Sequence, residues 1–286
     1  MTISFKDKVA IVTGAGGGLG KAYALELAKR GAKVVVNDLG GARDGTGTSD
    51  AAAQVVEQIK SAGGEAMANG GSVTEYEQMV EMVAKAKEAW GGVHVLINNA
   101  GISQRSLAIE TQFPVYQKVV DVDLLAPIAL TQEILPRMAT RKSGRLVFIS
   151  SVAGKVGSPM RTAYSAAKHG LIGYADALRV ETAMLGLQVH VIAPGSIRTD
   201  VSRNAVTADG SRRGVSDGAI EKGMDPDRAA RLMLRAMARG EREIILAEGI
   251  ERTIARVRRK SPNRLFDMME QMMASGYAER MKSQDD

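Results

Sequence analysis

The chain has 286 residues, 45% of them hydrophobic, which is enough to bury the core of one α/β domain. It has no cysteine and three scattered histidines, which excludes a disulfide framework, a cysteine nucleophile and a thiolate metal site, and we expect no bound metal. The net charge of +6 raises the question of a nucleic-acid partner, but an aromatic content of 4% argues against base stacking, and we expect none.

The first predicted strand leads into a glycine-rich turn. Residues 9–12 are a short apolar run, as a parallel strand requires, and an amphipathic helix is predicted over about 21–30. Glycines between a strand and a helix let backbone N–H groups approach a pyrophosphate, whose charge the helix N-terminus favours. Any tight turn can contain glycines, and Leu19 breaks the strict G-x-G-x-x-G pattern, but this context predicts dinucleotide binding. The predicted contacts are Gly14, Gly16, Gly18, Leu19 and Gly20.

The second predicted strand, residues 33–38, ends in an acid. Asp38 follows Gly20 by 18 positions, close to the spacing at which a carboxylate meets the adenosine ribose hydroxyls. An acid there repels a 2′-phosphate, so we expect NAD as the preferred cofactor. Two alternatives stay open: Asp38 only caps the turn at 39–41, or Arg43 accepts the 2′-phosphate of NADP.

Helices and strands alternate over the next part of the chain. Helices are predicted over about 50–62 and 75–90, and strands over about 66–69 and 93–97. The last of these strands ends in Asn98-Asn99-Ala100-Gly101. Asparagines at a strand end can bridge backbone groups while small residues admit a ligand; an ordinary turn is the alternative.

Ser151, Tyr164 and Lys168 supply a hydroxyl, a phenol and an ammonium group within 18 residues of the sequence. Ser151 follows the apolar run 146–149, which is predicted to be a buried strand. Tyr164 and Lys168 are four positions apart, so on a helix they share one face. A nearby ammonium favours a phenolate, and a serine hydroxyl can hold a reacting oxygen. The set suits proton transfer at a carbonyl or alcohol oxygen, although Tyr-x-x-x-Lys is also a common chance spacing.

Together these motifs resemble the short-chain dehydrogenase/reductase family over about residues 6–247. The resemblance rests on Thr13-Gly14-x-x-x-Gly18-x-Gly20, Asn98-Asn99-Ala100-Gly101, Ser151, Tyr164-x-x-x-Lys168 and Pro194-Gly195. It implies one doubly wound α/β domain, a Rossmann fold with a central parallel sheet of about seven strands. It also implies an NAD(P)-dependent oxidoreductase that moves a hydride between nicotinamide and a secondary alcohol or ketone, with a small hydrophobic substrate such as a steroid or other lipid.

The resemblance assigns roles to individual residues. Tyr164 would be the catalytic acid/base, Lys168 would bind the nicotinamide ribose and favour the phenolate, and Ser151 would polarise the substrate oxygen. Tyr164 and Lys168 would also contact the cofactor. Further cofactor contacts would come from Asn98, Asn99, Ala100, Gly101, Pro194, Gly195, Ile197 and Thr199.

Two positions depart from the family pattern. Asp123 stands where the family usually has an asparagine that holds a proton-relay water. Its carboxylate can still accept a hydrogen bond from water, but its charge near Lys168 would oppose phenolate formation and reduce turnover. Ser72 precedes Val73 where many members have an aspartate at the adenine pocket. We expect Ser72 to replace that contact in part and Val73 to pack on the ring.

The second half of the predicted domain contains two long helices and a lid. Helices over about 114–140 and 163–185 resemble the pair that forms a dimer interface in this family, which implies a homodimer or homotetramer. The polar, glycine-punctuated segment 195–225 is predicted to be a substrate lid. A helix over 227–239 and a strand over 243–247 complete a domain of residues 1–249.

Residues 250–286 are predicted to form a helical C-terminal extension. Pro262 divides this tail into two expected helices, and the second carries a methionine-rich apolar stripe. We expect the stripe to dock on its own core or on a partner subunit. The alternatives are contact with a membrane surface and a flexible wall for a lipophilic substrate.

Within the family the resemblance is divided. The N-terminal half resembles the hydroxyacyl-CoA dehydrogenase domain of peroxisomal multifunctional enzymes, and the lid and tail resemble members related to 11β-hydroxysteroid dehydrogenases. A 3-hydroxyacyl-CoA dehydrogenase is therefore an alternative, with Arg212 and Arg213 as candidates to bind the CoA 3′-phosphate. A weakly catalytic dinucleotide sensor or scaffold is another alternative. Without a signal peptide, an integral membrane segment or a peroxisomal signal in the sequence, we expect a cytoplasmic location.

Overall fold

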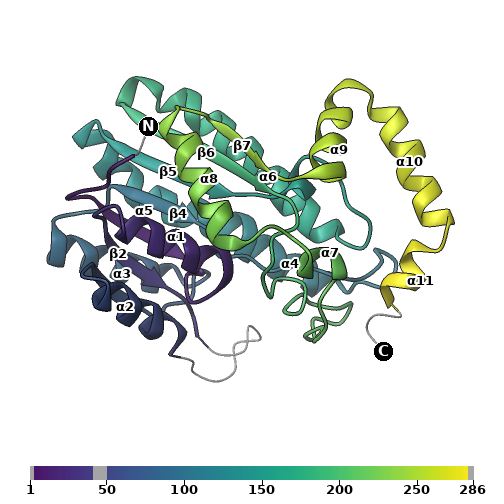
Figure 1. The fold of residues 1–286 in the computed structure, drawn as a ribbon, viewed down its shortest axis with the longest axis horizontal. Coiled ribbons are helices and arrows are strands. Elements are labelled where there is room, and N and C mark those ends of the chain that lie inside the picture. The colour runs from purple at the N-terminus through teal and green to yellow at the C-terminus, as the bar shows by residue number, and fades with distance from the viewer. Residues whose placement is uncertain (1–2, 41–49, 283–286) are drawn as a thin grey trace.

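A single parallel sheet forms the centre of the molecule in the computed structural model, which describes residues 3–40 and 50–282 (Figure 1). Its seven strands lie in the order β3-β2-β1-β4-β5-β6-β7. They are β1 Val9–Thr13, β2 Lys33–Asn37, β3 Glu65–Asn69, β4 Val95–Asn98, β5 Gly144–Ile149, β6 Leu187–Pro194 and β7 Glu243–Leu246. The strand order changes direction between β1 and β4, as in a doubly wound sheet, so the predicted fold class is confirmed.

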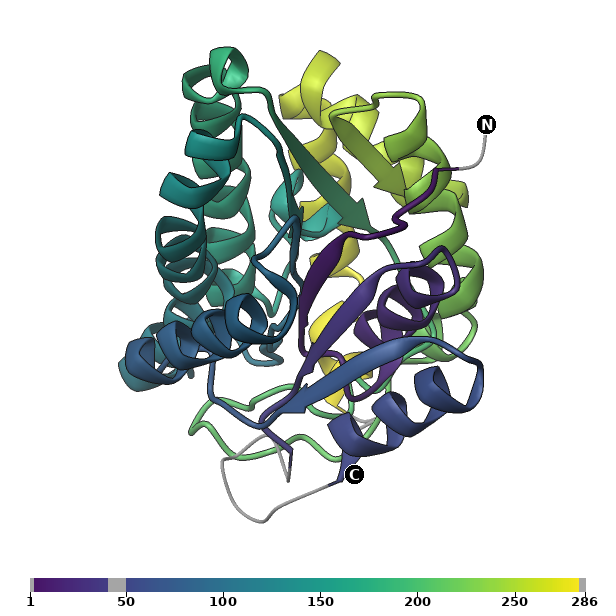
Figure 2. The ribbon, with the colours of Figure 1, turned by 90° about the vertical axis from the view of Figure 1, so that its left-hand side faces the viewer.

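Helices cover both faces of the sheet, which Figure 2 shows edge-on between two helical layers. One layer consists of α1 Gly18–Ala28, α2 Ala51–Ser61 and α8 Pro226–Ala238. The other consists of α3 Tyr76–Trp90, α5 Ala126–Arg141 and α6 Thr162–Glu181. Because both faces are buried, the central strands read as continuous apolar runs rather than as alternating patterns.

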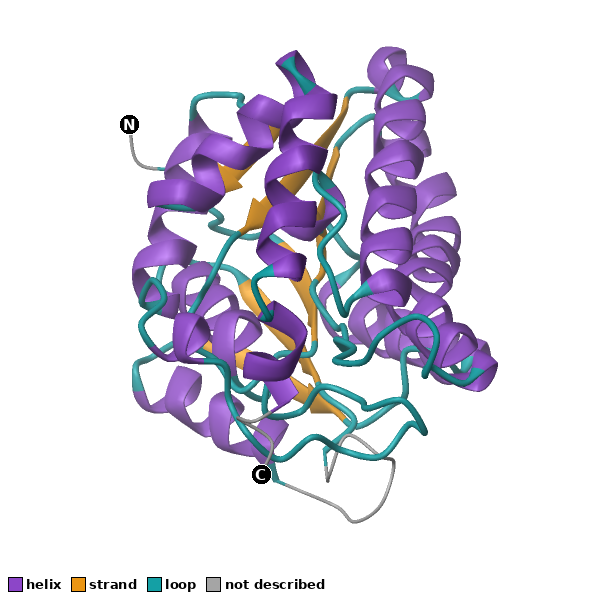
Figure 3. Ribbon diagram, turned by 90° about the vertical axis from the view of Figure 1, so that its right-hand side faces the viewer, coloured by secondary structure: helices purple, strands orange, loops and turns teal. Residues whose placement is uncertain are grey.

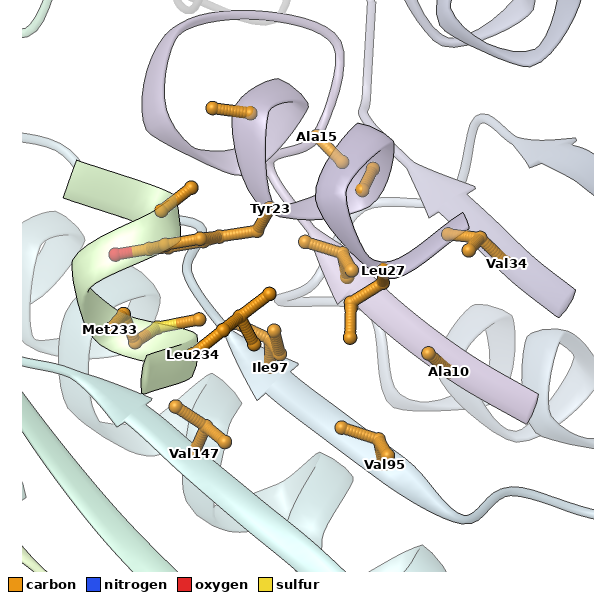
Figure 4. Close-up of a cluster of buried hydrophobic side chains, with 14 of the residues drawn as sticks. Ala10, Ala15, Tyr23, Leu27, Val34, Val95, Ile97, Val147, Met233 and Leu234 are labelled. Atoms are coloured by element: carbon orange, nitrogen blue, oxygen red, sulfur yellow. The ribbon is translucent and has the colours of Figure 1, made fainter. Parts of the chain in front are cut away.

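A cluster of buried hydrophobic side chains lies between α1, α8 and the sheet (Figure 4). Tyr23 and Leu27 of α1 and Met233 of α8 are fully buried there. They pack against strand residues such as Val95 and Val147. This packing holds α1, and therefore the glycine-rich turn that precedes it, in a fixed position on the sheet.

The helix predicted over 114–140 contains a break in its hydrogen-bonding pattern. α4 Phe113–Val120 and α5 are joined by a π-helical turn, Asp121–Leu125. A π turn inserts an extra residue, which rotates the side chains that follow it. Asp123 lies in this turn and its side chain is fully buried.

The segment predicted to be a lid has defined contacts with the body. It contains the short helix α7 Gly218–Glu221 and pairs with the loop after β4 through a bridge between Gln104 and Val206. The predicted lid is therefore attached to the loop after β4, and its role as a lid stays a prediction. Arg43 lies outside the described residues, as do residues 41–49 of the polar loop predicted around it.

The C-terminal extension forms three helices where two were predicted: α9 Gly249–Lys260, α10 Pro262–Ala274 and α11 Tyr277–Lys282. Pro262 begins the second helix as expected, and Gly276, at φ +82°, separates the third. Figures 1 and 3 show the extension along one side of the domain. On α10, Leu265 is buried while Phe266 and Met268 are each 44% exposed, so the predicted apolar stripe is only partly covered. None of the helices in the described part of the chain is long and apolar enough to cross a membrane.

A buried hydroxyl in the core generates a stability prediction. The Tyr23 hydroxyl has no hydrogen-bond partner among the described residues, and burial raises the pKa of this phenol. An unsatisfied buried polar group costs about 1–3 kcal/mol. Tyr23→Phe should therefore stabilise the fold by about 1 kcal/mol in chemical denaturation. Tyr174→Phe is the control, because the Tyr174 hydroxyl accepts a hydrogen bond from Gln132 at 3.4 Å, and it should give no gain. Loss of stability in Tyr23→Phe would contradict this assignment.

Candidate active site

A cavity of about 1300 Å³ lies at the carboxyl ends of the strands. It is where the sheet changes direction, the position at which open α/β sheets bind ligands. Its walls include all the residues predicted from the sequence to be catalytic: Asp123, Ser151, Tyr164 and Lys168. They also include the predicted cofactor contacts Gly14, Gly16, Gly18, Leu19, Gly20, Asp38, Ser72, Val73, Asn99, Ala100, Gly101, Pro194, Gly195, Ile197 and Thr199. Asn98 is buried behind the wall and donates a hydrogen bond to Thr131 at 3.2 Å.

The glycine-rich turn is shaped by backbone requirements. Gly14 and Gly18 adopt φ values of +62° and +50°, which strongly favour glycine. A Cβ on Gly20 would collide with the Gly14 carbonyl and the Asn99 side chain. The turn therefore leaves its backbone open to the cavity, a cradle that a side chain would fill.

Asn99 and Thr13 join the ends of β1 and β4. The Asn99 amide donates to the carbonyls of Thr13, at 2.9 Å, and Gly14, at 3.0 Å. The Thr13 hydroxyl accepts the N–H groups of Asn99 and Ala100, both at 3.0 Å. Asn99 thus bridges backbone groups, one of the two uses considered from the sequence. Thr13 was not predicted to be a site residue. Its position directly after the apolar run 9–12 was the feature of the sequence that could have indicated this role.

Asp38 directly follows β2 and accepts hydrogen bonds from two different turns. Its carboxylate accepts the N–H of Gly16 at 2.8 Å and that of Gly40 at 3.2 Å. The second bond is the local cap considered as an alternative, and the first ties Asp38 to the glycine-rich turn. Asp38 also lines the cavity, so its carboxylate stands beside the space expected for the adenosine ribose.

Ser72 and Val73 lie at the same end of the cavity. The Ser72 hydroxyl oxygen is 2.8 Å from the Thr74 hydroxyl oxygen. The backbone N–H of Ser72 donates a hydrogen bond to the Gln78 side chain at 2.8 Å. Val73 is half-buried and packs against the core. An apolar surface is therefore present where Val73 was expected to meet an adenine ring.

A buried ion pair lies at the other end. Lys168 Nζ is 3.1 Å from Asp123 Oδ2, and the two side chains are 5% and 0% exposed. Lys168 Nζ also donates to the Ile149 carbonyl at 3.0 Å, and Asp123 Oδ1 accepts the Ile102 N–H at 2.8 Å. The pair thus joins α6, the end of β5, the loop after β4 and the π turn.

The charge of Lys168 depends on this partner. Burial alone would lower the pKa of Lys168, but the Asp123 carboxylate, with a smaller contribution from Tyr164, raises it above its ordinary value. Lys168 therefore stays an ammonium group at neutral pH. Its Nζ lies 5.7 Å from the centre of the Tyr164 ring, so the positive charge stands beside the phenol.

Ser151 faces the same region from the end of β5. Its Oγ accepts the N–H of Ala153 at 3.0 Å and donates to the Pro194 carbonyl over a long 3.4 Å. Because the second bond is weak, the hydroxyl can turn its proton toward another acceptor. Ser151, Tyr164 and Lys168 therefore line one end of the cavity, with a donor, a phenol and a buried cation close together.

A second charged cluster anchors the lid. The Asp217 carboxylate accepts Arg105 Nε and Nη2 at 3.0 and 2.5 Å and Arg161 Nη2 at 3.1 Å, and it also pairs with Arg213. These arginines come from the loop after β4, the start of α6 and the lid itself. Arg213 is buried in this cluster, so the expectation that it binds a CoA phosphate is wrong; Arg212 does line the cavity. Nothing in the local sequence pattern singled out Asp217.

The chain belongs to the short-chain dehydrogenase family, whose model matches residues 8–210. This confirms the family resemblance and places the protein among oxidoreductases. Dehydrogenase/reductase SDR family member 7B of Danio rerio is 38% identical over 250 residues, which cover 85% of this chain and 78% of that protein. The peroxisomal hydratase-dehydrogenase-epimerase of Saccharomyces cerevisiae is 47% identical over 194 residues, which cover 67% of this chain but only 21% of the yeast protein.

Solved structures share the fold. A short chain dehydrogenase from Mycobacterium avium is 33% identical with a TM-score of 0.68, and the match covers 82% of this chain and 78% of that one. A short chain dehydrogenase/reductase from Burkholderia phymatum in complex with NAD is 24% identical with a TM-score of 0.78, covering 91% of this chain and 96% of that one.

The lid cluster generates a prediction on stability and pH. Burial alone would raise the pKa of Asp217, but Arg105, Arg213 and Arg161 together lower it. Its stabilising effect is therefore complete above the carboxyl's unfolded pKa, near 4, and is lost as the pH falls through the lower folded value. Asp217→Asn should cost about 3 kcal/mol at pH 7, because three guanidinium groups lose their counter-charge. The difference from wild type in thermal unfolding should shrink below about pH 4.

Glu221→Gln is the control for this prediction, since Glu221 is an exposed acid of α7. It should change stability by less than about 0.5 kcal/mol. Equal effects of the Asp217 and Glu221 variants at pH 7 would show that the cluster does not anchor the lid.

Proposed function

We propose that this protein is a nicotinamide-dinucleotide oxidoreductase that moves a hydride between the cofactor and the carbon of a small alcohol or ketone. One observation carries the proposal: Ser151, Tyr164 and Lys168 line one end of a cavity whose other walls include the open glycine-rich turn and Asp38. The charge pattern fits, because N–H groups at the turn suit a pyrophosphate while the acid at the end of β2 suits ribose hydroxyls.

The residues divide the chemistry between them. A bound nicotinamide ring supplies or accepts the hydride. Tyr164 exchanges a proton with the substrate oxygen, and Ser151 donates a hydrogen bond to the same oxygen. Lys168, kept charged by Asp123, places a positive charge beside the phenol and would bind a ribose hydroxyl of the cofactor.

The position of Asp38 favours NAD over NADP. Its carboxylate lines the cavity and would repel a 2′-phosphate at the ribose. The Burkholderia phymatum protein, which shares the fold, is described in complex with NAD. Arg43 keeps NADP as the alternative, and direct comparison of the two cofactors decides between them.

Apolar side chains support a hydrophobic alcohol or ketone as the substrate. Ile102 after β4 and Val201 and Ile220 of the lid segment line the cavity. A 3-hydroxyacyl-CoA is the second candidate, supported by the match to the dehydrogenase-containing yeast protein and by Arg212 on the cavity wall. A sensor with little catalysis is the third, supported only by Asp123 at the usual asparagine position.

Cofactor titration and a substrate screen test these proposals. We expect tighter binding of NADH than of NADPH, followed by turnover with steroid or other lipid alcohols and ketones at the nicotinamide absorbance band. Turnover confined to CoA esters would favour the second candidate, and tight binding without turnover on any class would favour the sensor. Absence of binding to either dinucleotide would refute the proposal.

Tyr164→Phe tests the proton-transfer role. The variant lacks the hydroxyl but keeps the ring on the cavity wall, so dinucleotide affinity should change less than about threefold. Turnover should fall by at least about 100-fold, the usual contribution of a positioned acid/base. Tyr174→Phe, on the same helix but packed against the core, is the matched control and should keep its turnover. Turnover in Tyr164→Phe within tenfold of wild type would contradict the assignment.

A further inference from the structure

A carboxylate from the C-terminal extension reaches the end of β6. Glu251 Oε2 accepts the N–H of Ser196 at 2.7 Å, and Glu251 Oε1 accepts its hydroxyl at 2.7 Å. The two residues are 55 positions apart in the sequence. One side chain therefore satisfies both donors of a single residue, an arrangement that fixes the orientation of the Ser196 backbone.

The local structure of α9 favours a carboxylate at this place. Gly249, at φ +55°, turns the chain into the helix, and Glu251 lies in the first turn. A negative charge is stabilised there by the unpaired N–H groups and the dipole of the helix. Its neighbour Ile250 is 70% exposed, so the contact of this turn with the body is made by the carboxylate rather than by apolar burial.

Ser196 belongs to a wall that faces the proposed cofactor. Pro194, Gly195, Ile197 and Thr199 line the cavity around it. Two backbone hydrogen bonds hold this wall from other sides. The Gly195 N–H donates to the Leu246 carbonyl at 2.9 Å, and the Ser196 carbonyl accepts the Met224 N–H at 2.9 Å. The Glu251 carboxylate occupies the third side, in the space that a Cβ on Gly195 would need.

The same extension lies near the catalytic serine. α9 packs against the short 3₁₀ turn Val152–Gly154 that directly follows Ser151. Ser151 in turn donates to the carbonyl of Pro194, the first residue of the wall. α9 thus contacts both segments that meet at the reacting end of the cavity.

We propose that Glu251 is a positioning residue that fixes the wall at residues 194–199, and through it the nicotinamide half of the bound dinucleotide. The residues that line the cavity include Gly195 and Ile197 but not Glu251, so Glu251 would act on the cofactor through the wall rather than by contact. The inference rests on the proposed dinucleotide site. It adds that the C-terminal extension helps to position the residues that bind the nicotinamide. The glycine-rich turn and Asp38 would hold the adenosine and the pyrophosphate at the other end of the cavity, so binding of these groups should not depend on Glu251.

Two ligands that differ in the nicotinamide group test this role. ADP-ribose carries the adenosine, the pyrophosphate and the second ribose but no nicotinamide ring, whereas NADH carries the ring as well. In Glu251→Ala, ADP-ribose should bind within about twofold of wild type, NADH should bind about tenfold more weakly, and turnover should fall about 100-fold, since a misplacement near 1 Å has this effect on rate. Glu251→Gln retains one acceptor oxygen and should fall between wild type and Glu251→Ala in both measurements.

Glu248→Gln is the matched control, because Glu248 precedes the same helix and its ion pair with Arg228 at 2.7 Å is solvent-exposed. It should leave both affinities and turnover unchanged. Equal weakening of NADH and ADP-ribose in Glu251→Ala, together with a lower melting temperature, would show a merely structural role and overturn the inference. Unchanged NADH binding and turnover in a folded variant would overturn it too. If wild-type protein binds neither ligand, the proposed function itself fails, a result seen before any variant is made.

Discussion

The buried ion pair between Lys168 and Asp123 is the interaction on which the site depends. The two groups are 3.1 Å apart and almost completely shielded from water, so each charge stabilises the other strongly. The pair also has a mechanical effect, because Lys168 holds the end of β5 and Asp123 holds the loop after β4. Removal of either partner would leave a buried charge and would also loosen the two strand ends that carry the proposed chemistry.

The rest of the architecture brings distant segments to this pair. Parallel strands place their carboxyl ends along one edge of the sheet, so the glycine-rich turn, Asp38 and Ser151 meet there although they are far apart in the sequence. The predicted lid and the C-terminal extension are then held in place by carboxylate side chains. Asp217 ties the lid to the loop after β4 and to α6, and Glu251 ties the extension to the wall beyond β6. Core packing positions the strands, and the carboxylates of Asp217 and Glu251 position the segments that lie over them.

The features that could be predicted from the sequence were those marked by residues close together in the chain. A strand, a glycine-rich turn and a helix occupy neighbouring positions, and Asp38 ends an apolar run, so the fold class and the contents of the cavity wall could be predicted. The π turn at Asp121–Leu125 could not, because its sequence looks like part of one long helix. Asp217 meets Arg105 across 112 positions, and only the folded chain shows that Arg213 is buried rather than facing a ligand. The expected homo-oligomer, the cytoplasmic location and the domain boundary at residue 249 stay predictions.

The pH dependence of turnover in Asp123→Asn tests the central claim most directly, with wild-type protein measured beside it. Loss of a negative charge favours release of protons from every group nearby. Both limbs of the pH profile for alcohol oxidation should therefore move to lower pH, by about one unit or more, as expected for a charge a few ångströms away in a buried site. Profiles that coincide for the two proteins, or a shift to higher pH, would contradict the view that Asp123 controls the charge of Lys168 at the reacting centre.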